Sequence, residues 1–192
     1  MKRIEIPFTF KLPVRNSEHE RYYNYVQRKL SSLSRLFNDQ DAYYKLLTEY
    51  DPVVYEVYEV KRPEVPGELS VGVSIIHPGK VGKEYFMTRG HFHTVLDTAE
   101  VYYCLKGEGY LVMETPEGDT EEEKLNPGQF LYVPPRWAHR AVCTSTEDFV
   151  LLFIYPAQAG HDYETIEKKG FRKLVIGGEN GVKIIENPKW RQ

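Results

Sequence analysis

Short runs of alternating apolar and polar residues fill the chain from residue 53 to residue 155, and Pro- or Gly-rich breaks separate them. Because successive side chains of a strand point to opposite faces, this pattern predicts β-strands rather than helices. Strands of this length and spacing are typical of an antiparallel barrel or a double-sheet jelly roll. The predicted strands are 53–60, 69–77, 84–88, 100–106, 109–115, 119–125, 130–133, 139–144 and 148–155.

The N-terminal part has two further patterns. Apolar residues alternate with polar ones over 4–12, which predicts one extended strand. An unpaired apolar strand needs a partner edge on its own sheet or on a second subunit, so this strand favours a dimer. A capping-box pattern at Ser17 and Glu20 then precedes apolar residues at helical spacing over 22–33, and it predicts a helix.

A second helix and a C-terminal hairpin complete the predicted elements. The helix begins at Asp39 or Asp41 and ends before Pro52, because the residue before a proline disfavours helical backbone. Strands over 171–176 and 182–185 form the hairpin, with a longer loop between them. No linker interrupts the chain, which is predicted to be a single domain with three parts: an N-terminal strand and helices (1–50), a β-barrel (51–160) and a C-terminal extension (161–192).

The composition excludes several classes of protein. A net charge of -3 gives no broad basic field for a nucleic acid, and no apolar run approaches the length of a membrane span. The N-terminus lacks the apolar core of a signal peptide, so a cytoplasmic location is expected. Cys104 and Cys143 form no CxxC motif, which argues against a zinc ribbon or a disulfide scaffold and fits small buried thiols.

Four residues are candidate metal ligands. His91 and His93 are two positions apart, so on a strand they point to the same face, where the fold would have to bring Glu100 and His139. Three neutral imidazoles and one carboxylate suit a divalent metal such as iron, manganese, nickel or zinc. A single histidine is more often an ordinary surface or core residue, but the His-x-His pair and its setting among strands favour a metal site.

The spacing of these ligands resembles the two motifs of the cupin superfamily. The residues that match are His91, His93, Glu100 and Gly107 in the first motif, and Gly128, Pro134 and His139 in the second. Two departures stand out: six residues separate His93 from Glu100, where the family usually has three or four, and Arg136 stands where Gly is common. The resemblance implies a mainly β cupin fold, a double-stranded β-helix or jelly-roll barrel.

These departures match one branch of the superfamily, the cupin-type phosphoglucose isomerases. The similar segments are 51–58, 78–84, 90–93, 96–102, 115–119, 133–140, 155–163 and 187–190, so that the resemblance covers roughly residues 30–190. It implies a homodimeric enzyme of glycolysis and gluconeogenesis that interconverts glucose 6-phosphate and fructose 6-phosphate. It also implies one divalent transition metal per subunit, with iron expected first and manganese, nickel and zinc as alternatives.

The chemistry of this reaction suggests roles for three residues. Glu100 is the only carboxylate that the motif places on the metal, which makes it the candidate base for hydrogen transfer between C1 and C2. Metal coordination weakens a carboxylate base, so a direct hydride shift is the rival route. His161 is the candidate for ring opening or hydrogen transfer, with a loop histidine capped by Asp162 as the alternative. Tyr102 shares the strand face of Glu100 and is expected to orient Glu100 or a sugar hydroxyl.

The phosphate of such a substrate needs hydrogen-bond donors at the end of the pocket away from the metal. Thr88 and the backbone of Gly90 directly precede the metal ligands, and Ser74 lies on an earlier strand. The resemblance adds three tyrosines, which completes the expected binding set: Tyr55, Ser74, Thr88, Gly90, Tyr155 and Tyr163. Lys80, Lys83 and Arg89 could raise the local potential for a dianion, but a charged run of this kind is more often a solvated loop, which is the preferred interpretation.

Two other functions are compatible with four cupin ligands. A cupin iron dioxygenase would have an apolar pocket without phosphate donors, whereas hydroxyl-bearing residues crowd this sequence. A non-catalytic sugar-binding cupin would be expected to lose a ligand, and all four are present here. The isomerase is therefore the leading hypothesis.

Overall fold

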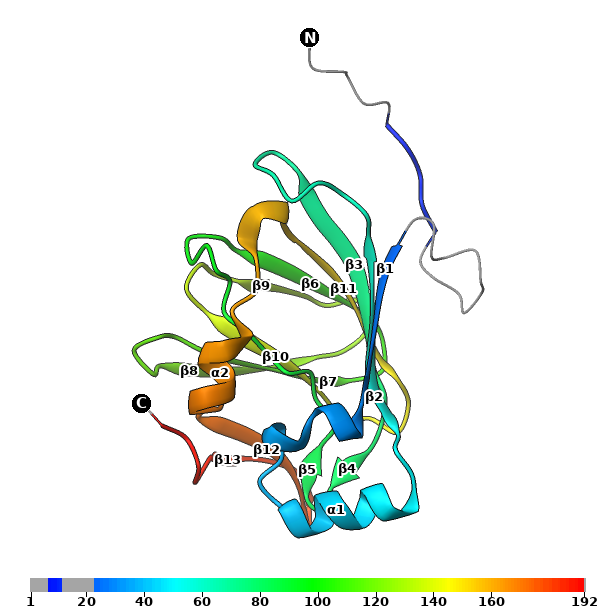
Figure 1. The fold of residues 1–192 in the computed structure, drawn as a ribbon, viewed down its shortest axis with the longest axis vertical. Coiled ribbons are helices and arrows are strands. Elements are labelled where there is room, and N and C mark those ends of the chain that lie inside the picture. Colours follow the sequence, from blue (N-terminus) through cyan, green and yellow to red (C-terminus); the bar gives the residue numbers. More distant parts are fainter. Residues whose placement is uncertain (1–6, 12–22, 192) are drawn as a thin grey trace.

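The computed structural model describes residues 7–11 and 23–191, which form thirteen strands and two α-helices around a β-barrel (Figure 1). The helices are α1 (Gln40–Glu49) and α2 (Tyr163–Lys169). The strands are β1 (Tyr23–Lys29), β2 (Val53–Val60), β3 (Leu69–Ile76), β4 (Lys80–Val81), β5 (Glu84–Tyr85), β6 (Glu100–Lys106), β7 (Gly109–Glu114), β8 (Thr120–Leu125), β9 (Phe130–Val133), β10 (Ala138–Cys143), β11 (Phe149–Pro156), β12 (Lys173–Gly178) and β13 (Gly181–Glu186).

Three antiparallel sheets build the molecule. One has six strands in the order β1-β2-β3-β11-β6-β9, one has three in the order β10-β7-β8, and one has four in the order β13-β12-β5-β4. Neighbours such as β3 and β11 are far apart in sequence, which is the arrangement of a jelly roll rather than of a simple meander. The predicted fold class, a mainly β cupin jelly roll, is confirmed.

The inner faces of the sheets form one hydrophobic core. Phe149 and Leu151 alternate with outward-facing residues on β11, and both are fully buried. Leu111 of β7 packs into the same cluster from the three-stranded sheet, and Phe37 closes it beside α1. The period-two pattern of the sequence therefore marks the core-facing side of each strand.

The predicted helix over 22–33 is wrong. Tyr23–Lys29 is strand β1, which pairs antiparallel with β2, so that Tyr25 lies opposite Tyr58. The apolar spacing fitted a helix, but pairing with a neighbouring strand decides such segments more strongly than local pattern does. Ser17 and Glu20 lie outside the described residues. Of the predicted strand at 4–12, residues 7–11 have no regular structure and the remainder is outside the described range.

The second helix is confirmed as α1. The Asp39 side chain accepts a hydrogen bond from the Ala42 N–H over 3.0 Å, as expected of an N-cap, and the helix ends at Glu49, before Pro52. Most central strands match their predicted ranges within one or two residues, but the run at 84–88 is a strand only over Glu84–Tyr85. The short strand β4 was not predicted.

The C-terminal part differs in two details. The hairpin of β12 and β13 is confirmed, but Gly178 pairs with Gly181, so its loop has two residues instead of a longer stretch. Helix α2 was not predicted, although the Asp162 side chain accepts from the Thr165 N–H at its start and Gly170 ends it. Strand β12 joins β5, so this part completes a sheet with the barrel.

Two smaller expectations can be compared with the structure. Cys104 and Cys143 are free and buried, as predicted. Among the described residues, no helix is long and apolar enough to cross a membrane.

Candidate metal centre and substrate pocket

The fold brings the four predicted metal ligands together. One ligand atom of each residue lies within 4.8 Å of the corresponding atoms of the other three: His91, His93, Glu100 and His139. The backbones of His91 and His139 exchange two hydrogen bonds, of 3.3 and 3.1 Å, which joins the loop of the first motif to β10. Glu100 is the first residue of β6 and pairs with Val133 of β9, which directly precedes Pro134 within the second motif.

The hydrogen bonds of His93 determine which of its nitrogens faces the centre. The Thr98 hydroxyl donates to the Val95 carbonyl over 2.6 Å, so it accepts from His93 Nδ1 over 2.9 Å. The proton of a neutral His93 is therefore on Nδ1, and its Nε2 carries a lone pair. That lone pair faces Glu100 Oε2 at 3.1 Å, where two electron-pair donors require a cation or an added proton between them.

His139 repeats this arrangement. Its Nδ1 lies 3.3 Å from the Trp137 carbonyl, which accepts a hydrogen bond from it. The opposite nitrogen, Nε2, lies 2.9 Å from Glu100 Oε2 without forming a hydrogen bond. His91 Nε2 is also buried and has no hydrogen-bond partner. Buried polar atoms are rarely left without partners, so these nitrogens suit a ligand that accepts lone pairs.

The electrostatic environment suits the same ligand. Burial, followed by the neighbouring histidines, lowers the pKa of His91 well below its ordinary value, so this imidazole stays neutral and its lone pair is available. Burial opposes ionisation of Glu100, but His139 and His93 outweigh it and lower its pKa to about 2. Three imidazoles and an ionised carboxylate are a donor set for a divalent transition metal, and the residues present fit such an ion.

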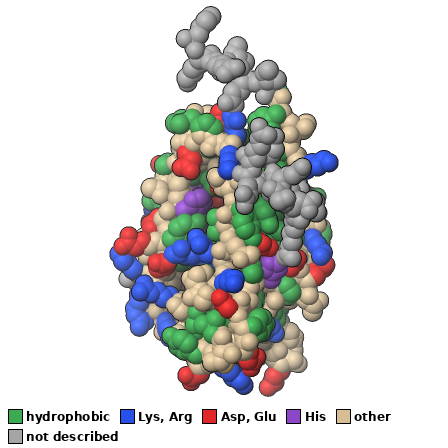
Figure 2. Space-filling view, turned by 45° about the vertical axis from the view of Figure 1, so that its right-hand side comes forward, with side chains coloured by type: hydrophobic (Ala, Val, Ile, Leu, Met, Phe, Trp, Pro, Cys, Tyr) green, Lys and Arg blue, Asp and Glu red, His purple; other side chains and the backbone are tan. Residues whose placement is uncertain are grey.

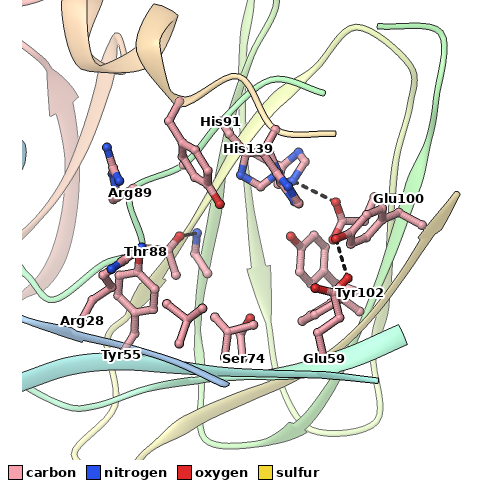
Figure 3. Close-up of a pocket in the computed structure, with 18 residues that line it drawn as sticks. Arg28, Tyr55, Glu59, Ser74, Thr88, Arg89, His91, Glu100, Tyr102 and His139 are labelled. Atoms are coloured by element: carbon pink, nitrogen blue, oxygen red, sulfur yellow. Dashed lines mark hydrogen bonds and ion pairs between the residues drawn. The ribbon is translucent and has the colours of Figure 1, made fainter. Parts of the chain in front are cut away.

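A cavity of about 270 Å³ opens beside this cluster (Figure 3). All six predicted substrate-binding residues and all three predicted catalytic residues line it: Tyr55, Ser74, Thr88, Gly90, Tyr155, Tyr163, Glu100, Tyr102 and His161. Of the predicted ligands, His91, Glu100 and His139 reach its wall. The structure therefore brings the whole predicted set to one site.

Three charged residues of the pocket were missed. Arg28 lies on β1, which the sequence had suggested was a helix, so its face could not be predicted. Glu59 has the same strand parity as Tyr55 on β2, a signal that was present but not used. The interpretation of Arg89 as a solvated loop residue is wrong, because it lines the pocket and its guanidinium lies 4.8 Å from the centroid of the Tyr163 ring.

The segment before the ligands is fixed by its backbone. Gly90 has a φ of 73°, a left-handed conformation that favours glycine. A Cβ built on it would lie 2.4 Å from Phe171 Cε2, so no other residue fits without rearrangement. Nearby, the Thr88 hydroxyl accepts a hydrogen bond from the Ala141 N–H over 3.0 Å. The wall that precedes His91 is thus held rigidly against β10.

Two predicted catalytic residues contact the ligand cluster. The His161 ring lies 4.3 Å from the ring of His91, between centroids, and stacks on Tyr163 at 5.6 Å. Burial is the main cause that lowers the pKa of His161, to about 4. The Asp162 side chain caps helix α2 and does not cap His161. This argues against the alternative in which His161 is a structural loop histidine held by Asp162. Burial and then Glu100 hold the pKa of Tyr102 well above its ordinary value, so its hydroxyl stays protonated.

The family match and the similar proteins indicate the same family. The sequence matches the family described as glucose-6-phosphate isomerase (GPI) over residues 27–191. A glucose-6-phosphate isomerase of Thermococcus gammatolerans is 53% identical over 165 residues, which are 86% of this chain and 87% of the relative. The enzyme of Pyrococcus furiosus is 50% identical, with the same shares covered.

A more distant bacterial relative extends this similarity. The putative glucose-6-phosphate isomerase 1 of Rhizobium meliloti is 41% identical over 168 residues, which are 86% of this chain and 78% of the relative. Family match and identity both extend over most of the chain, and the family match includes every residue of the ligand cluster and all pocket residues except Val26. The chain therefore belongs to the glucose-6-phosphate isomerase family and is an isomerase.

Proposed function

We propose that this protein is a metal-dependent glucose-6-phosphate isomerase that interconverts glucose 6-phosphate and fructose 6-phosphate in glycolysis and gluconeogenesis. The observation that carries the proposal is that His93 Nε2 and His139 Nε2 both point their lone pairs at Glu100 beside the pocket. His91, His93, Glu100 and His139 would hold one divalent transition metal per subunit, with Fe²⁺ as the first candidate and Mn²⁺, Ni²⁺ and Zn²⁺ as alternatives.

The opposite end of the pocket suits a phosphate dianion. Arg28 and Arg89 supply positive charge there, and Figure 3 shows both on the side away from Glu100. The Thr88 hydroxyl and the Gly90 backbone lie next to them, where an oxyanion can approach the glycine closely. Tyr55, Ser74, Tyr155 and Tyr163 complete the set that we propose binds the sugar phosphate.

The reaction moves one hydrogen between C2 and C1 while the carbonyl moves from C1 to C2. A bound divalent metal would supply a Lewis acid that polarises this carbonyl. We propose that Glu100 accepts the proton from one carbon and returns it to the other. In the rival route a hydride moves directly between the carbons, and Glu100 only holds the geometry.

His161 and Tyr102 act on the oxygen atoms in this proposal. His161 is neutral at neutral pH, because burial lowers its pKa to about 4, so its free nitrogen can accept a proton during ring opening. Tyr102 keeps its proton and can donate a hydrogen bond to Glu100 or to a sugar hydroxyl. Its ring lies 5.7 Å from that of His139, between centroids, which places the phenol beside the ligand cluster.

A coupled assay tests the proposed function. Metal-loaded protein is incubated with fructose 6-phosphate, and glucose 6-phosphate formation is expected. Iron, manganese and nickel are supplied in turn after chelation, and activity should be lost with the metal and return with it. The absence of turnover with all three metals would refute the isomerase proposal. Full activity after exhaustive chelation would refute metal dependence alone.

An isotope experiment separates the two routes of hydrogen transfer. Glucose 6-phosphate deuterated at C2 is converted in ordinary water, and the deuterium at C1 of the product is measured. Transfer through Glu100 is expected to exchange part of the label with solvent. Complete retention of the label would favour the direct hydride shift.

We also propose a homodimer, because a row of apolar residues crosses the outer face of the six-stranded sheet. Residues that lie directly opposite one another share a face, and one such row is Tyr25, Tyr58, Val73, Leu152, Tyr103 and Phe130. Phe130 is 71% exposed and Tyr132, two positions away on the same face, is 60% exposed. Tyr58 and Val73 in the middle of the row are buried, whereas Tyr25 near one edge is 45% exposed. Exposed apolar residues of this kind are typical of a protein–protein interface.

The location follows from the substrate. Phosphorylated sugars are charged and do not cross membranes, so we propose that the enzyme works in the cytoplasm, where they are retained.

A further inference from the structure

The backbone segment that leads to the first metal ligand forms a bulge against β10. Backbone hydrogen bonds join the segment to the strand at two pairs of positions: Thr88 with Ala141, and His91 with His139. Between these pairs, two residues of the segment, Arg89 and Gly90, lie opposite one residue of the strand, Arg140. A bulge leaves its extra residue without a partner on the neighbouring strand, and bulges beside active sites often redirect a group toward the site.

The side chain of Arg140 supplies the hydrogen bonds that the bulge lacks. Its Nη2 donates to the Arg89 carbonyl over 2.6 Å, and its Nε donates to the same carbonyl over 3.2 Å. Arg140 is a buried residue whose guanidinium lies 4.5 Å from the centroid of the Phe171 ring. In the ranges 7–11 and 23–191, no carboxylate forms an ion pair with this guanidinium. A buried charge without a counter-ion is costly, which argues against a purely structural role.

Arg140 reaches this carbonyl from the face of β10 that is turned away from the pocket. Its neighbours on the strand, His139 and Ala141, both line the cavity, so the Arg140 side chain between them points to the opposite face. The peptide bond between Arg89 and Gly90 is trans, and the C=O and N–H of a trans peptide point in opposite directions. Because the carbonyl points toward Arg140, the Gly90 N–H points toward the cavity.

This N–H is available to a ligand. In the described parts of the chain, the Gly90 N–H forms no backbone hydrogen bond, and Gly90 lines the cavity. No side chain shields it, since a Cβ on Gly90 would lie 2.4 Å from Phe171 Cε2. A cation on the carbonyl oxygen polarises the peptide, so the N–H becomes a stronger donor to an anion. Figure 3 shows the neighbouring Thr88 and Arg89 on the wall away from Glu100, where the phosphate would bind.

We propose that Arg140 is a positioning residue for the phosphate, because it holds the peptide before Gly90 so that the Gly90 N–H donates to a phosphate oxygen. The inference rests on the proposed function, since it needs a sugar phosphate in this pocket. Arg28 and Arg89 line the cavity and act on the phosphate directly, whereas Arg140 acts through a backbone amide. The phosphate is unchanged by the reaction, so this contact should stabilise substrate and transition state equally and contribute to KM rather than to kcat.

Kinetics of Arg140→Met test this proposal. Methionine is an apolar side chain without a donor for the Arg89 carbonyl. We expect the KM for fructose 6-phosphate to rise about ten-fold, with kcat within about two-fold of the wild type. Inorganic phosphate serves as a competitive inhibitor without a sugar, and its Ki should rise by the same factor. Metal affinity, measured by competition with a chelator, should not change.

Matched variants identify the cause. Arg140→Lys keeps the charge and one donor, so its KM should rise by only about three-fold. Arg172→Met is the control, because it removes an arginine of similar contacts outside the pocket. Arg172 Nη1 donates to the Gly118 carbonyl over 3.1 Å, and the guanidinium lies 5.4 Å from the centroid of a Trp190 ring. Arg172 does not line the cavity, and the control should keep the wild-type KM and Ki.

The possible outcomes separate this inference from the proposed function. A wild-type KM in folded, active Arg140→Met would overturn the positioning role and leave the proposed function intact. If Arg140→Met does not fold, Arg140→Lys decides, and a wild-type KM and phosphate Ki in that variant would overturn the role. A fall in metal affinity that parallels the rise in KM would show a general structural effect instead. Absence of isomerisation in the wild type would overturn the proposed function and this inference with it.

Discussion

At the scale of single residues, the orientation of the ligands depends on neighbours that the motif does not contain. Thr98 lies in the six-residue interval between His93 and Glu100, where the cupin pattern usually has three or four residues. Its hydroxyl accepts from His93 Nδ1 and donates to the Val95 carbonyl, which leaves His93 Nε2 as the free nitrogen. The long interval thus contributes a residue that selects the tautomer.

Replacing this hydroxyl should weaken metal binding without removing a ligand. In Thr98→Val the His93 Nδ1 proton keeps only the Thr98 carbonyl, at 3.2 Å, as an acceptor. Loss of such a supporting partner typically lowers metal affinity by about ten-fold or more, so about ten-fold is expected here. Metal affinity is measured by competition with a chelator. Thr94→Val, at an exposed position of the same loop, is the control and should bind metal like the wild type.

Removing a ligand should have a larger effect. His139→Ala, like His91→Ala, deletes an imidazole from the cluster, and both metal content and turnover should fall together. The fold should persist, because the hydrogen bonds between the two positions are formed by the backbone. Metal analysis, the isomerase assay and circular dichroism of the same preparations measure metal content, turnover and fold. A variant with normal metal content and normal activity would show that the residue is not a ligand.

The sequence identifies the ligand residues better than it identifies the backbone conformation around them. Arg136 stands where Gly is common in the superfamily, and it has a φ of 73°, the conformation that glycine adopts without strain. The local fold of the second motif is therefore kept although its usual residue is absent. A motif search based on that glycine would miss a structural position that the chain still occupies.

At the scale of elements, strands with strict alternation were predictable and segments with mixed signals were not. The strand over Phe130–Val133 matches its prediction, because alternation and flanking turns agree there. Strand β1 was mistaken for a helix, because its pairing with β2 cannot be inferred from its own residues. Helix α2 has only seven residues, so its apolar stripe is too short to be distinguished from a loop.

Buried Glu114 should make the C-terminal elements fold together with the barrel. This residue of β7 is fully buried, and its carboxylate lies 2.6 Å from Lys169 Nζ, 2.9 Å from Trp190 Nε1 and 2.7 Å from the Arg172 N–H. Glu114→Ala leaves these donors and the Lys169 charge without their partner. We expect the free energy of unfolding to fall by about 3 kcal/mol, the lower part of the range for a broken buried ion pair.

Denaturant unfolding measures this effect. Glu164→Gln is the control, because Glu164 forms an exposed ion pair with Lys168 on α2 and should contribute little to stability. A single transition that shifts as a whole in Glu114→Ala would support one domain from the N-terminal strand to the C-terminal hairpin. Loss of the C-terminal elements alone, with the barrel transition unchanged, would contradict it.

At the scale of the whole molecule, the sequence predicted which residues line the pocket better than it predicted how their charges are distributed along it. All of the residues proposed for catalysis and substrate binding line one pocket. The motif spacing specifies Glu100 among them, and the resemblance specifies the tyrosines. The separation of Arg28 from Glu59 depends on the register of β1, β2 and β3, which only the folded sheet defines. A charge gradient along a pocket is therefore a property of the sheet rather than of any segment.

The dimer is the prediction that depends on the largest surface. The sequence suggests it through the apolar strand predicted at 4–12, whereas in the described residues the outer face of the six-stranded sheet supports it. Figure 2, with the β1 side turned forward, shows apolar side chains (green) among the charged ones on the molecular surface. Tyr103 and Phe130 extend this face to the far edge, with ring centroids 4.4 Å apart.

A charged residue in this face should prevent association. Phe130→Glu places a carboxylate where the partner subunit would bury an aromatic ring, and burial of an unpaired charge is strongly unfavourable. Light scattering is expected to give twice the chain mass of 22.5 kDa for the wild type and the chain mass itself for the variant. Tyr44→Glu, at a 60% exposed position on α1, is the control and should remain dimeric. A wild-type protein that is monomeric at micromolar concentration would contradict the dimer, and a dimeric Phe130→Glu would mean that a different face forms the interface.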